Sequence, residues 1–267
     1  MTEFSGPVPG APVWSLTAEE ANADISELQA AIGDLAGLVA GSCGLPELLA
    51  KVASFAVDAI PDADGAGVTV LRVDRSDNMV EALAASVSFI SEIDEIQYVT
   101  LNEGPCITAA LERRTVRSGL LGGEKMWPRF GPQVIRLGVH SALSLPLMLS
   151  DQVIGVINVY AYGKDVFDDH AAELGEAFAQ PAAVAVHNAA VLARAMALTV
   201  QMQTALSTRS VIDQAIGLLR RRSGRSAEEA FAQLRSISQA EHRELAEVAK
   251  RLVKEAVRRA RARHNPT

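Results

Sequence analysis

An apolar residue recurs at every seventh position over a long stretch in the second half of the chain. The positions are Val184, Val191, Leu198, Ala205, Ile212 and Leu219. Apolar residues at this period are typical of a helix that packs along a single seam. Asn188 and Arg209 fall at partner core positions, where a polar group can fix the register at some cost in stability. The pattern predicts one long helix, in which Pro181 removes one backbone hydrogen bond.

The chain after this seam reads as three short amphipathic helices between residues 208 and 254. The first ends at Gly224, and Ser226 with Glu229 forms the capping box of the second. Three such helices can bury their apolar stripes only against one another, so we expect a small bundle. The apolar positions are Val211, Ile212, Ala215, Ile216 and Leu219, then Ala230, Phe231, Leu234 and Ile237, then Leu245, Val248, Ala249 and Leu252.

This stretch resembles the ANTAR family of RNA-binding antiterminator modules. The resemblance lies in VIDQAIGLL, GRSAEEAFAQLRSISQ and LAEVAKRLV, which follow one another at the spacing of the family. It implies a three-helix module that binds paired RNA stem-loops and prevents a transcription terminator from forming. Periodicity alone would predict only a helical bundle.

The charge of the chain is unevenly distributed. From Arg209 onward there are 14 Lys and Arg against 7 Asp and Glu, whereas the first 208 residues carry 11 and 25. Such a run is often only a solvated helix face, but together with the resemblance a basic end on an acidic chain indicates a nucleic-acid-binding module.

The basic and amide residues of this module are the candidate RNA-binding residues, because arginine contacts phosphates with two hydrogen bonds and stacks on splayed bases. They are Arg209, Gln214, Arg220, Arg221, Arg222, Arg225, Arg235, Gln239, His242, Arg243 and Lys250. The family often has Lys at Ile216, and Asn, Lys and Arg at His242, Glu244 and Ala246. These departures predict weaker RNA binding or a different RNA target.

The first part of the chain is expected to be a disordered lead-in (residues 1–16) followed by a helix (17–44). Thr17 and Glu20 have the spacing of a capping box. A seam of spacings three and four follows, made of Ile25, Leu28, Ile32, Leu35 and Val39. The seam fits a dimerisation helix and a helix packed on its own domain equally well.

Strand and helix patterns alternate from residue 45 to about 162, which predicts an α+β domain. Strands are expected at 65–73 and 79–87, and a hairpin at 141–149 and 153–160 around Ser150 and Asp151. The motifs IDEIQY, NEGPCITAALE, MWPRF, SALSLPLMLSDQVIGVINVYA and FDDHAAELGEAFA resemble the GAF family. That resemblance implies a six-stranded antiparallel sheet with a pocket for a small ligand on one face.

Cys106, Trp127, His140 and Tyr160 are the candidate ligand-binding residues of this domain. Cys106 follows Gly104 and Pro105 at a predicted helix start, where a thiol pKa is lowered. A redox sensor, a chromophore attachment site and a plain buried residue all remain open. His140 could bind haem or be structural, and the aromatic rings could line a pocket or fill the core. The cofactor is unknown, and no metal-ligand spacing occurs.

The sequence predicts no enzyme, because no nucleophile, base and orienting group occur together. A methionine sulfoxide reductase would need a partner for Cys106, and only Cys43 is available. Two cysteines without metal spacing, and neither a signal peptide nor a run of about 18 uninterrupted apolar residues, predict a cytoplasmic protein without a membrane span.

Together these patterns predict a homodimeric, signal-responsive antitermination regulator. Its expected parts are the lead-in and helix, a GAF-like domain (45–193), a coiled-coil-like connector (194–207), an ANTAR-like domain (208–257) and a basic tail (258–267). The connector would transmit a change in dimer packing, unless it is a static linker. The alternatives are a DNA-binding regulator, and a sensor or dimerisation protein whose module no longer binds nucleic acid.

Overall fold

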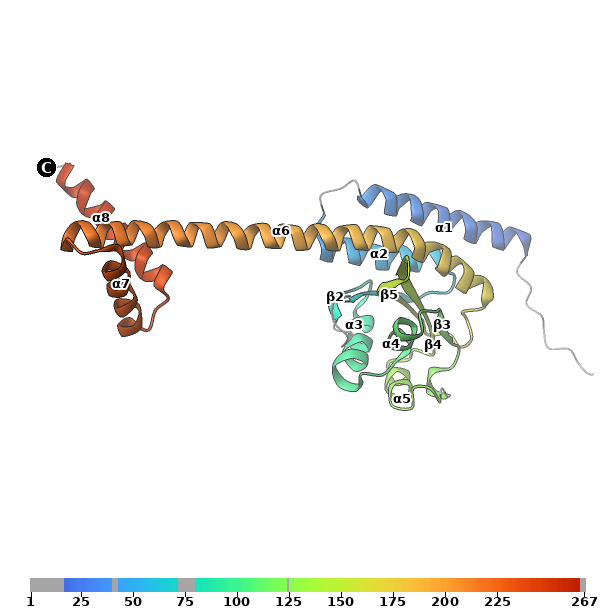
Figure 1. The fold of residues 1–267 in the computed structure, drawn as a ribbon. Helices are drawn as coiled ribbons and strands as arrows, with labels where there is room; N and C mark the ends of the chain where they lie inside the picture. Colours follow the sequence, from blue (N-terminus) through green and yellow to red (C-terminus); the bar gives the residue numbers. More distant parts are fainter. Residues whose placement is uncertain (1–16, 40–42, 72–79, 124, 265–267) are drawn as a thin grey trace, which may run out of the picture. The chain divides into compact units, whose positions relative to one another are not determined.

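The computed structural model describes residues 17–39, 43–71, 80–123 and 125–264 (Figure 1). The predicted lead-in, residues 1–16, lies outside the described residues. The chain divides into two compact units, Met1–Ala193 and Arg194–Thr267. We describe each unit by itself.

The first unit is built on an antiparallel sheet with the strand order β2-β1-β5-β4-β3. The described residues form five strands, not the six that the GAF resemblance implied. The strands are β1 (Gly65–Leu71), β2 (Val80–Ala85), β3 (Val116–Ser118), β4 (Ser141–Leu149) and β5 (Gln152–Ala161). The predicted hairpin is confirmed, and Ser150 in its turn has a left-handed backbone with φ of 52°.

Helical segments flank this sheet (Figure 1). On one side are α1 (Ala18–Val39), α2 (Leu45–Ala59) and the first part of α6 (Asp169–Ser223). Toward the other side lie α3 (Ser88–Asp94), the π-helix η1 (Glu95–Leu101), α4 (Pro105–Glu112) and α5 (Phe130–Val134). The short 3-10 turns η2 (Leu121–Gly123) and η3 (Ile135–Leu137) complete the unit. This is the α+β fold that the sequence predicted.

The two faces of the sheet belong to two different cores. Side chains alternate between faces along a strand, so Ile157 and Val159 of β5 point one way while Asn158 and Tyr160 point the other. We call the first core the apolar core; it joins the sheet to α1, α2 and α6 and includes Phe178. The second core includes Ile90, Cys106, Trp127, Phe130 and Tyr160.

Helix α1 packs within its own unit. Leu28 and Leu35 are buried in the apolar core, and Ile32 packs against it. Three of the five seam residues are therefore covered inside the chain, as the alternative of intramolecular packing expects, whereas Ile25 is 43% exposed. The side chain of Val39, the last seam position, lies outside the described residues.

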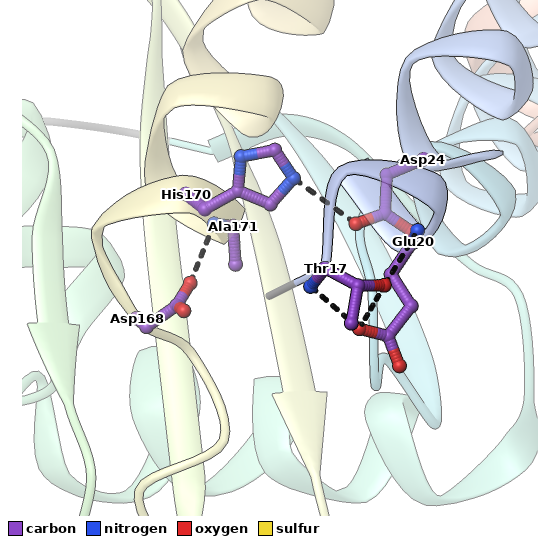
Figure 2. A network of polar contacts seen from close by, with 6 residues as sticks. All are labelled: Thr17, Glu20, Asp24, Asp168, His170 and Ala171. Atoms are coloured by element: carbon purple, nitrogen blue, oxygen red, sulfur yellow. Dashed lines mark hydrogen bonds and ion pairs between the residues drawn. The ribbon is translucent and has the colours of Figure 1, made fainter. Parts of the chain in front are cut away.

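Polar contacts fix both the start of α1 and the start of α6 (Figure 2). The predicted capping box is confirmed, because Thr17 N donates to Glu20 Oε2 at 2.8 Å and Glu20 N donates to Thr17 Oγ1 at 3.2 Å. Asp168 Oδ1 accepts from Ala171 N at 2.9 Å and so caps α6. The His170 ring and Asp24 Oδ2, 3.0 Å apart, join the two helices.

The second unit is a three-helix bundle made of the end of α6, α7 (Ala227–Glu241) and α8 (Leu245–His264). Gly224 adopts φ of 70° and its N–H binds the carbonyl of Arg220, which ends α6 as predicted. The Ser226–Glu229 capping box that starts α7 is confirmed as well. The first part of the predicted basic tail continues α8 as far as His264.

The bundle core is formed by Ala215, Leu219, Ala230, Leu234, Val248 and Ala249. The seven-residue seam of α6 therefore enters this core at its end, since Ile212 packs against it and Leu219 is part of it. Phe231 was expected in the apolar stripe of α7, but its side chain is 38% exposed. Its ring instead lies 6.0 Å from the guanidinium carbon of Arg235.

Among the described helices, α6 is long and apolar enough to cross a membrane, by length and composition only. No membrane span was expected from the sequence, because the apolar stretch of α6 is interrupted by polar residues. Phe178 and Val186 of α6 are buried in the apolar core, and Ala215 and Leu219 in the bundle core. Protein packing thus accounts for part of its apolar surface.

Candidate functional site

A buried cluster of polar side chains lies on the second face of the sheet. Its members, here called the polar cluster, are Thr69, Asp94, Gln97, Tyr98, Cys106, Asn158 and Tyr160. Thr69 comes from β1, Asn158 and Tyr160 come from β5, and Cys106 comes from α4. The other three are supplied by the end of α3 and by η1. Seven residues of π-helix are unusual, and π-helical turns are frequent at functional sites.

Tyr98 is the centre of the hydrogen bonds in this cluster. Its hydroxyl donates to Cys106 Sγ at 2.6 Å and lies 2.8 Å from Thr69 Oγ1. Because the single hydroxyl proton of Tyr98 goes to the sulfur, Thr69 is the donor in the second bond. Burial is the main reason why the pKa of Tyr98 is raised well above its ordinary value.

Gln97 connects η1 to the first turn of α4. Its side-chain Oε1 accepts from Cys106 N at 3.2 Å. Gly104 is required at this junction, because a Cβ there would collide with Gln97 Oε1. The amide group Nε2 of Gln97 is buried and has no hydrogen-bond partner among the described residues.

The thiol of Cys106 is not activated. The sequence placed it correctly at a helix start, where a lowered pKa would have favoured a reactive thiol and burial the plain buried residue. Burial instead raises the pKa of Cys106 to about 11, against the lowering effect of the Tyr98 hydrogen bond. The side chain is only 1% exposed, so the loss of hydration outweighs the local field of an eight-residue helix.

In the part of the chain that the structure describes, Asp94 is a buried carboxyl group without a counter-charge. Its side chain is 5% exposed, and Oδ1 has no hydrogen-bond partner among the described residues. Burial raises the pKa of Asp94 to about 7. Its charge also raises the pKa values of Tyr98, Cys106 and Tyr160, after the effect of their own burial. Asp94 therefore lies within electrostatic reach of the whole cluster.

Three of the four predicted ligand-binding residues come together. Cys106, Trp127 and Tyr160 are buried in the second core, where Trp127 Nε1 donates to Thr108 Oγ1 at 2.9 Å. His140 lies just before β4, not on the strand itself, and its ring atom Nδ1 is buried without a partner in the described part of the chain. No described contact joins His140 to the other three.

The two cysteines do not meet. Cys43 packs against the apolar core and Cys106 lies in the second core, so the sheet separates them. Two-thiol redox chemistry between them would require a rearrangement of this unit.

The second unit carries the predicted RNA-binding residues on its surface. All eleven side chains are exposed. They are Arg209, Gln214, Arg220, Arg221, Arg222, Arg225, Arg235, Gln239, His242, Arg243 and Lys250. In the described residues none of them forms an ion pair. The solvated arginine and lysine side chains among them can bind phosphate without first losing a partner.

The structure divides these residues between the two ends of α7. Arg220, Arg221, Arg222 and Arg225 lie at the α6–α7 turn, and Gln239, His242 and Arg243 lie at the α7–α8 turn. The helix between the turns has 15 residues, which corresponds to about 22 Å. Arg209, Gln214, Arg235 and Lys250 lie on the helices themselves. Seven of the eleven predicted residues therefore gather at two turns, here called the two basic turns, and the set does not form a single cluster.

Acidic groups of the bundle neutralise only a part of its basic surface. Arg251 of α8 pairs with Glu241 of α7 at 2.6 Å, and this contact lowers the pKa of Glu241. Glu229 binds Ser226 N in the capping box. Among the described residues no arginine pairs with Glu228, Glu229 or Glu247, although the charge of Arg220 contributes to the lowered pKa of Glu228. Those pairings would have favoured a module that has lost nucleic-acid binding.

Sequence comparison assigns a family to both units. The GAF domain family model matches residues 44–187, and the ANTAR domain family model matches residues 200–253. The chain belongs to the GAF family. It is a GAF and ANTAR domain-containing protein, as the motifs indicated. The polar cluster lies in its GAF domain, and the two basic turns lie in its ANTAR domain.

Solved structures similar to this protein cover the GAF part. One is the GAF domain of a phosphoenolpyruvate-protein phosphotransferase from Coxiella burnetii, at 15% identity over 66% of this chain and 99% of that chain, with a TM-score of 0.49. Another is the free methionine-R-sulfoxide reductase from Neisseria meningitidis with its substrate, at 16% identity over 68% and 98%, with a TM-score of 0.48. No curated protein matches the chain. The family assignment rests on the sequence match.

The sequence motifs did not indicate Asp94, Gln97 and Tyr98 as site residues, although all three lie in the quoted motif IDEIQY. A second signal was available in the strands. Thr69 and Asn158 are single polar residues inside otherwise apolar strands, and both are fully buried. Two polar residues on the inward face of a sheet indicate a polar site more strongly than a helix-start cysteine does.

Proposed function

We propose that this GAF and ANTAR domain-containing protein is a signal-responsive antitermination regulator. Its GAF domain would hold a small ligand, and its ANTAR domain would bind RNA stem-loops and prevent a terminator hairpin. The combination of a GAF sensor domain with an ANTAR domain fits a regulator of this general kind. The proposal is carried by the ANTAR match together with exposed, unpaired basic residues at both turns of the bundle.

Two basic turns suit a folded RNA. Their separation of about 22 Å exceeds the reach of one phosphate group, so each turn would contact a different part of a stem-loop. Phosphate contacts of this kind position an RNA without reading its sequence. Gln239 and His242 would add contacts to bases at the α7–α8 turn, because loop bases are held by hydrogen bonds on their edges.

A second copy of the chain would complete the regulator. The middle of α6 exposes Val191, Leu198 and Met202, and the last two are 57% and 60% exposed. Val191 and Leu198 lie on the seven-residue seam, and Met202 lies at a partner core position, seven residues before Arg209. An exposed apolar seam is stabilised when it packs against an equivalent helix. We propose that residues 194–207 form a coiled-coil-like connector between two copies of the chain.

Leu198→Asp should shift the protein from dimer to monomer in sedimentation velocity, while Thr199→Asp, one position off the seam, should not.

The test of RNA binding is titration of the full chain into a two-hairpin leader RNA at two salt concentrations. Arg221→Ala and Arg243→Ala should each weaken binding by roughly tenfold and reduce the salt dependence by about one ion. Arg136→Ala, an exposed arginine in the GAF domain, is the matched control and should leave binding unchanged.

The same titration separates the alternatives. Equal affinity for duplex DNA and for the hairpins would favour a DNA-binding regulator. Hairpin affinity that is unchanged in both arginine variants would contradict the proposal. Lys substitution at Ile216 and at Glu244 should increase affinity if the departures from the family pattern weaken RNA binding.

A further inference from the structure

The polar cluster has an opening to solvent between the sheet and the π-helix. A cleft of about 220 Å³ is lined by Leu83 and Ala84 of β2 and by Ser91, Asp94, Glu95 and Val99. Its walls are apolar on the side of Leu83, Ala84 and Val99. Two carboxyl groups, Asp94 and Glu95, and one hydroxyl group, Ser91, are its polar groups.

The buried oxygen of Asp94 is the unusual part of this cleft. A buried polar atom normally has a hydrogen-bond partner, and an exception needs a reason. Asp94 Oδ1 has no hydrogen-bond partner in the described residues, and burial together with the negative charge of Asp94 raises the pKa values of Tyr98, Cys106 and Tyr160. A cation in the cleft would supply the missing donor and the missing positive charge.

Close packing holds the position of Asp94. Gly67 of β1 allows the end of α3 to lie against the sheet, since a Cβ there would be 2.8 Å from Ile90 Cγ2 and 3.5 Å from Asp94 Oδ2. Ile90 and Ile93 of the same helix are fully buried. Asp94 thereby lies in the wall of the cleft on a rigid element, as a binding group must.

We propose that this cleft binds a small organic cation, a primary ammonium or guanidinium group on a short apolar chain, through the carboxylate of Asp94. This deepens the sensory part of the proposed function, because it names the chemical class of the GAF ligand. Glu95 adds a second negative charge at the rim, and Ser91 adds a hydroxyl acceptor. The volume admits only a short chain beyond the cationic group.

The occupied site would act on the rest of the cluster. Neutralising Asp94 removes the unfavourable charge next to Tyr98 and Cys106, the two groups that link η1 to β1 and α4. The titratable groups that face Asp94 are Glu95, Tyr98, Cys106 and Tyr160. None of them is cationic, so the ligand would be the only positive charge at the site among the described residues.

The test uses n-propylguanidinium and n-propylammonium as probes, with neutral n-propylurea as the control ligand. Binding to the full chain is followed by isothermal titration calorimetry at pH 8, without RNA. We expect at least one cation to bind at least tenfold more tightly than n-propylurea, and to lose at least tenfold in affinity with Asp94→Asn. Glu92→Gln, an exposed carboxylate on the same helix, should change the affinity by less than twofold.

Two further measurements keep the test decisive. Ser91→Trp places a large ring at the exposed rim and should abolish binding without changing charge or core. The affinity should rise nearly tenfold between pH 5 and 6 and level off above about pH 7.5, because only the ionised carboxyl group binds a cation.

The proposal is overturned if no probe binds, if n-propylurea binds as well as the cations, or if Asp94→Asn leaves the affinity unchanged. Its failure is distinguishable from failure of RNA binding. Arg221→Ala should retain cation binding, and a variant that loses the cation should still bind RNA when measured without ligand.

Discussion

The two faces of the GAF sheet are made from the same strands but differ in the side chains that they bury. The face toward α1, α2 and α6 is covered by aliphatic and aromatic side chains, which together form one continuous apolar core. The opposite face holds buried polar groups, and several of their atoms have no partner in the described part of the chain. The first face stabilises the domain, and the second gives up stability to present polar groups.

This difference follows from single positions. Thr69 stands between Val68 and Val70, and Asn158 stands between Ile157 and Val159, so in each strand the neighbours enter the apolar core while the polar residue faces the other way. A fully buried side chain in this sheet can therefore belong either to the apolar core or to the polar cluster. Removal of a buried apolar group should therefore cost the most stability, removal of the unpaired Asp94 carboxylate should raise stability, and removal of a hydrogen-bonded polar group should cost less.

The largest loss should come from the apolar face. Phe178 is fully buried in α6, and Phe178→Ala should lower the free energy of unfolding by about 3–5 kcal/mol because it removes apolar contacts and leaves a cavity. Chemical denaturation measures this. Leu111→Ala, on α4, is the control, since Leu111 is 64% exposed and its loss should cost less than about 0.5 kcal/mol. Equal losses of unfolding free energy in Phe178→Ala and Leu111→Ala would mean that burial in the apolar core does not determine stability.

The second change should stabilise the domain. Asp94 has a pKa of about 7 when folded, against an ordinary value of about 3.9. Between these two pH values the folded chain keeps a proton that the unfolded chain has released, so the free energy of unfolding falls as pH rises from about 4 to about 7. Asp94→Asn removes this dependence.

The advantage of Asp94→Asn over the unaltered protein should therefore be larger at pH 8 than at pH 5, by roughly 2–3 kcal/mol. Urea denaturation at both pH values measures it. A variant that is less stable than the unaltered protein at pH 8 would show that Asp94 has a favourable partner. It would contradict the view that this carboxyl group lowers the stability of the domain.

A smaller loss is expected at the centre of the polar cluster. Tyr98→Phe removes the hydroxyl group that joins Thr69 to Cys106, and leaves the Thr69 donor buried without a partner. The cost should be about 1–3 kcal/mol. The double variant Tyr98→Phe, Thr69→Val should recover part of that loss, because it removes the unpaired donor as well. Additive losses would show that the two groups are not coupled.

The smallest effect is expected at a second hydrogen bond on the same face. Ser144 Oγ donates to Asn158 Oδ1 at 2.8 Å, and both residues are fully buried. Ser144→Ala should lower the free energy of unfolding by about 0.5–1.5 kcal/mol, since one neutral hydrogen bond is lost. Thermal unfolding should detect this change. A loss as large as that of Phe178→Ala would contradict the view that this face adds little stability.

Local patterns predicted the elements of the protein well. The capping pairs Thr17–Glu20 and Ser226–Glu229, the stop at Gly224 and the β4–β5 hairpin were all expected, because each depends on residues close together in sequence. Phe231 was misplaced because helical periodicity gives the direction of an apolar stripe but not its width. The five-stranded sheet in the described residues likewise departs from the six strands that the family resemblance implied.

The site was less predictable, because its groups are distant in sequence. Thr69, Asp94 and Asn158 come from three separate elements, and nothing in their local sequence shows that they meet. At Cys106 the sequence left a reactive thiol and a plain buried residue open, and the structure favours the buried residue. Its helix start was correctly predicted, but the burial that raises its pKa depends on tertiary packing. The predicted RNA-binding residues are exposed as expected, while their division between two turns became evident only from the length of α7.

The separation of the two cysteines gives the protein a built-in position for spectroscopic labelling. Cys106 is closed to reagents by the second core, whereas Cys43 is only partly buried, immediately before α2. A maleimide dye should therefore modify Cys43 first, without any engineered cysteine. Fluorescence from that dye would report on the junction of α1 and α2, on the face of the sheet opposite the proposed cation cleft.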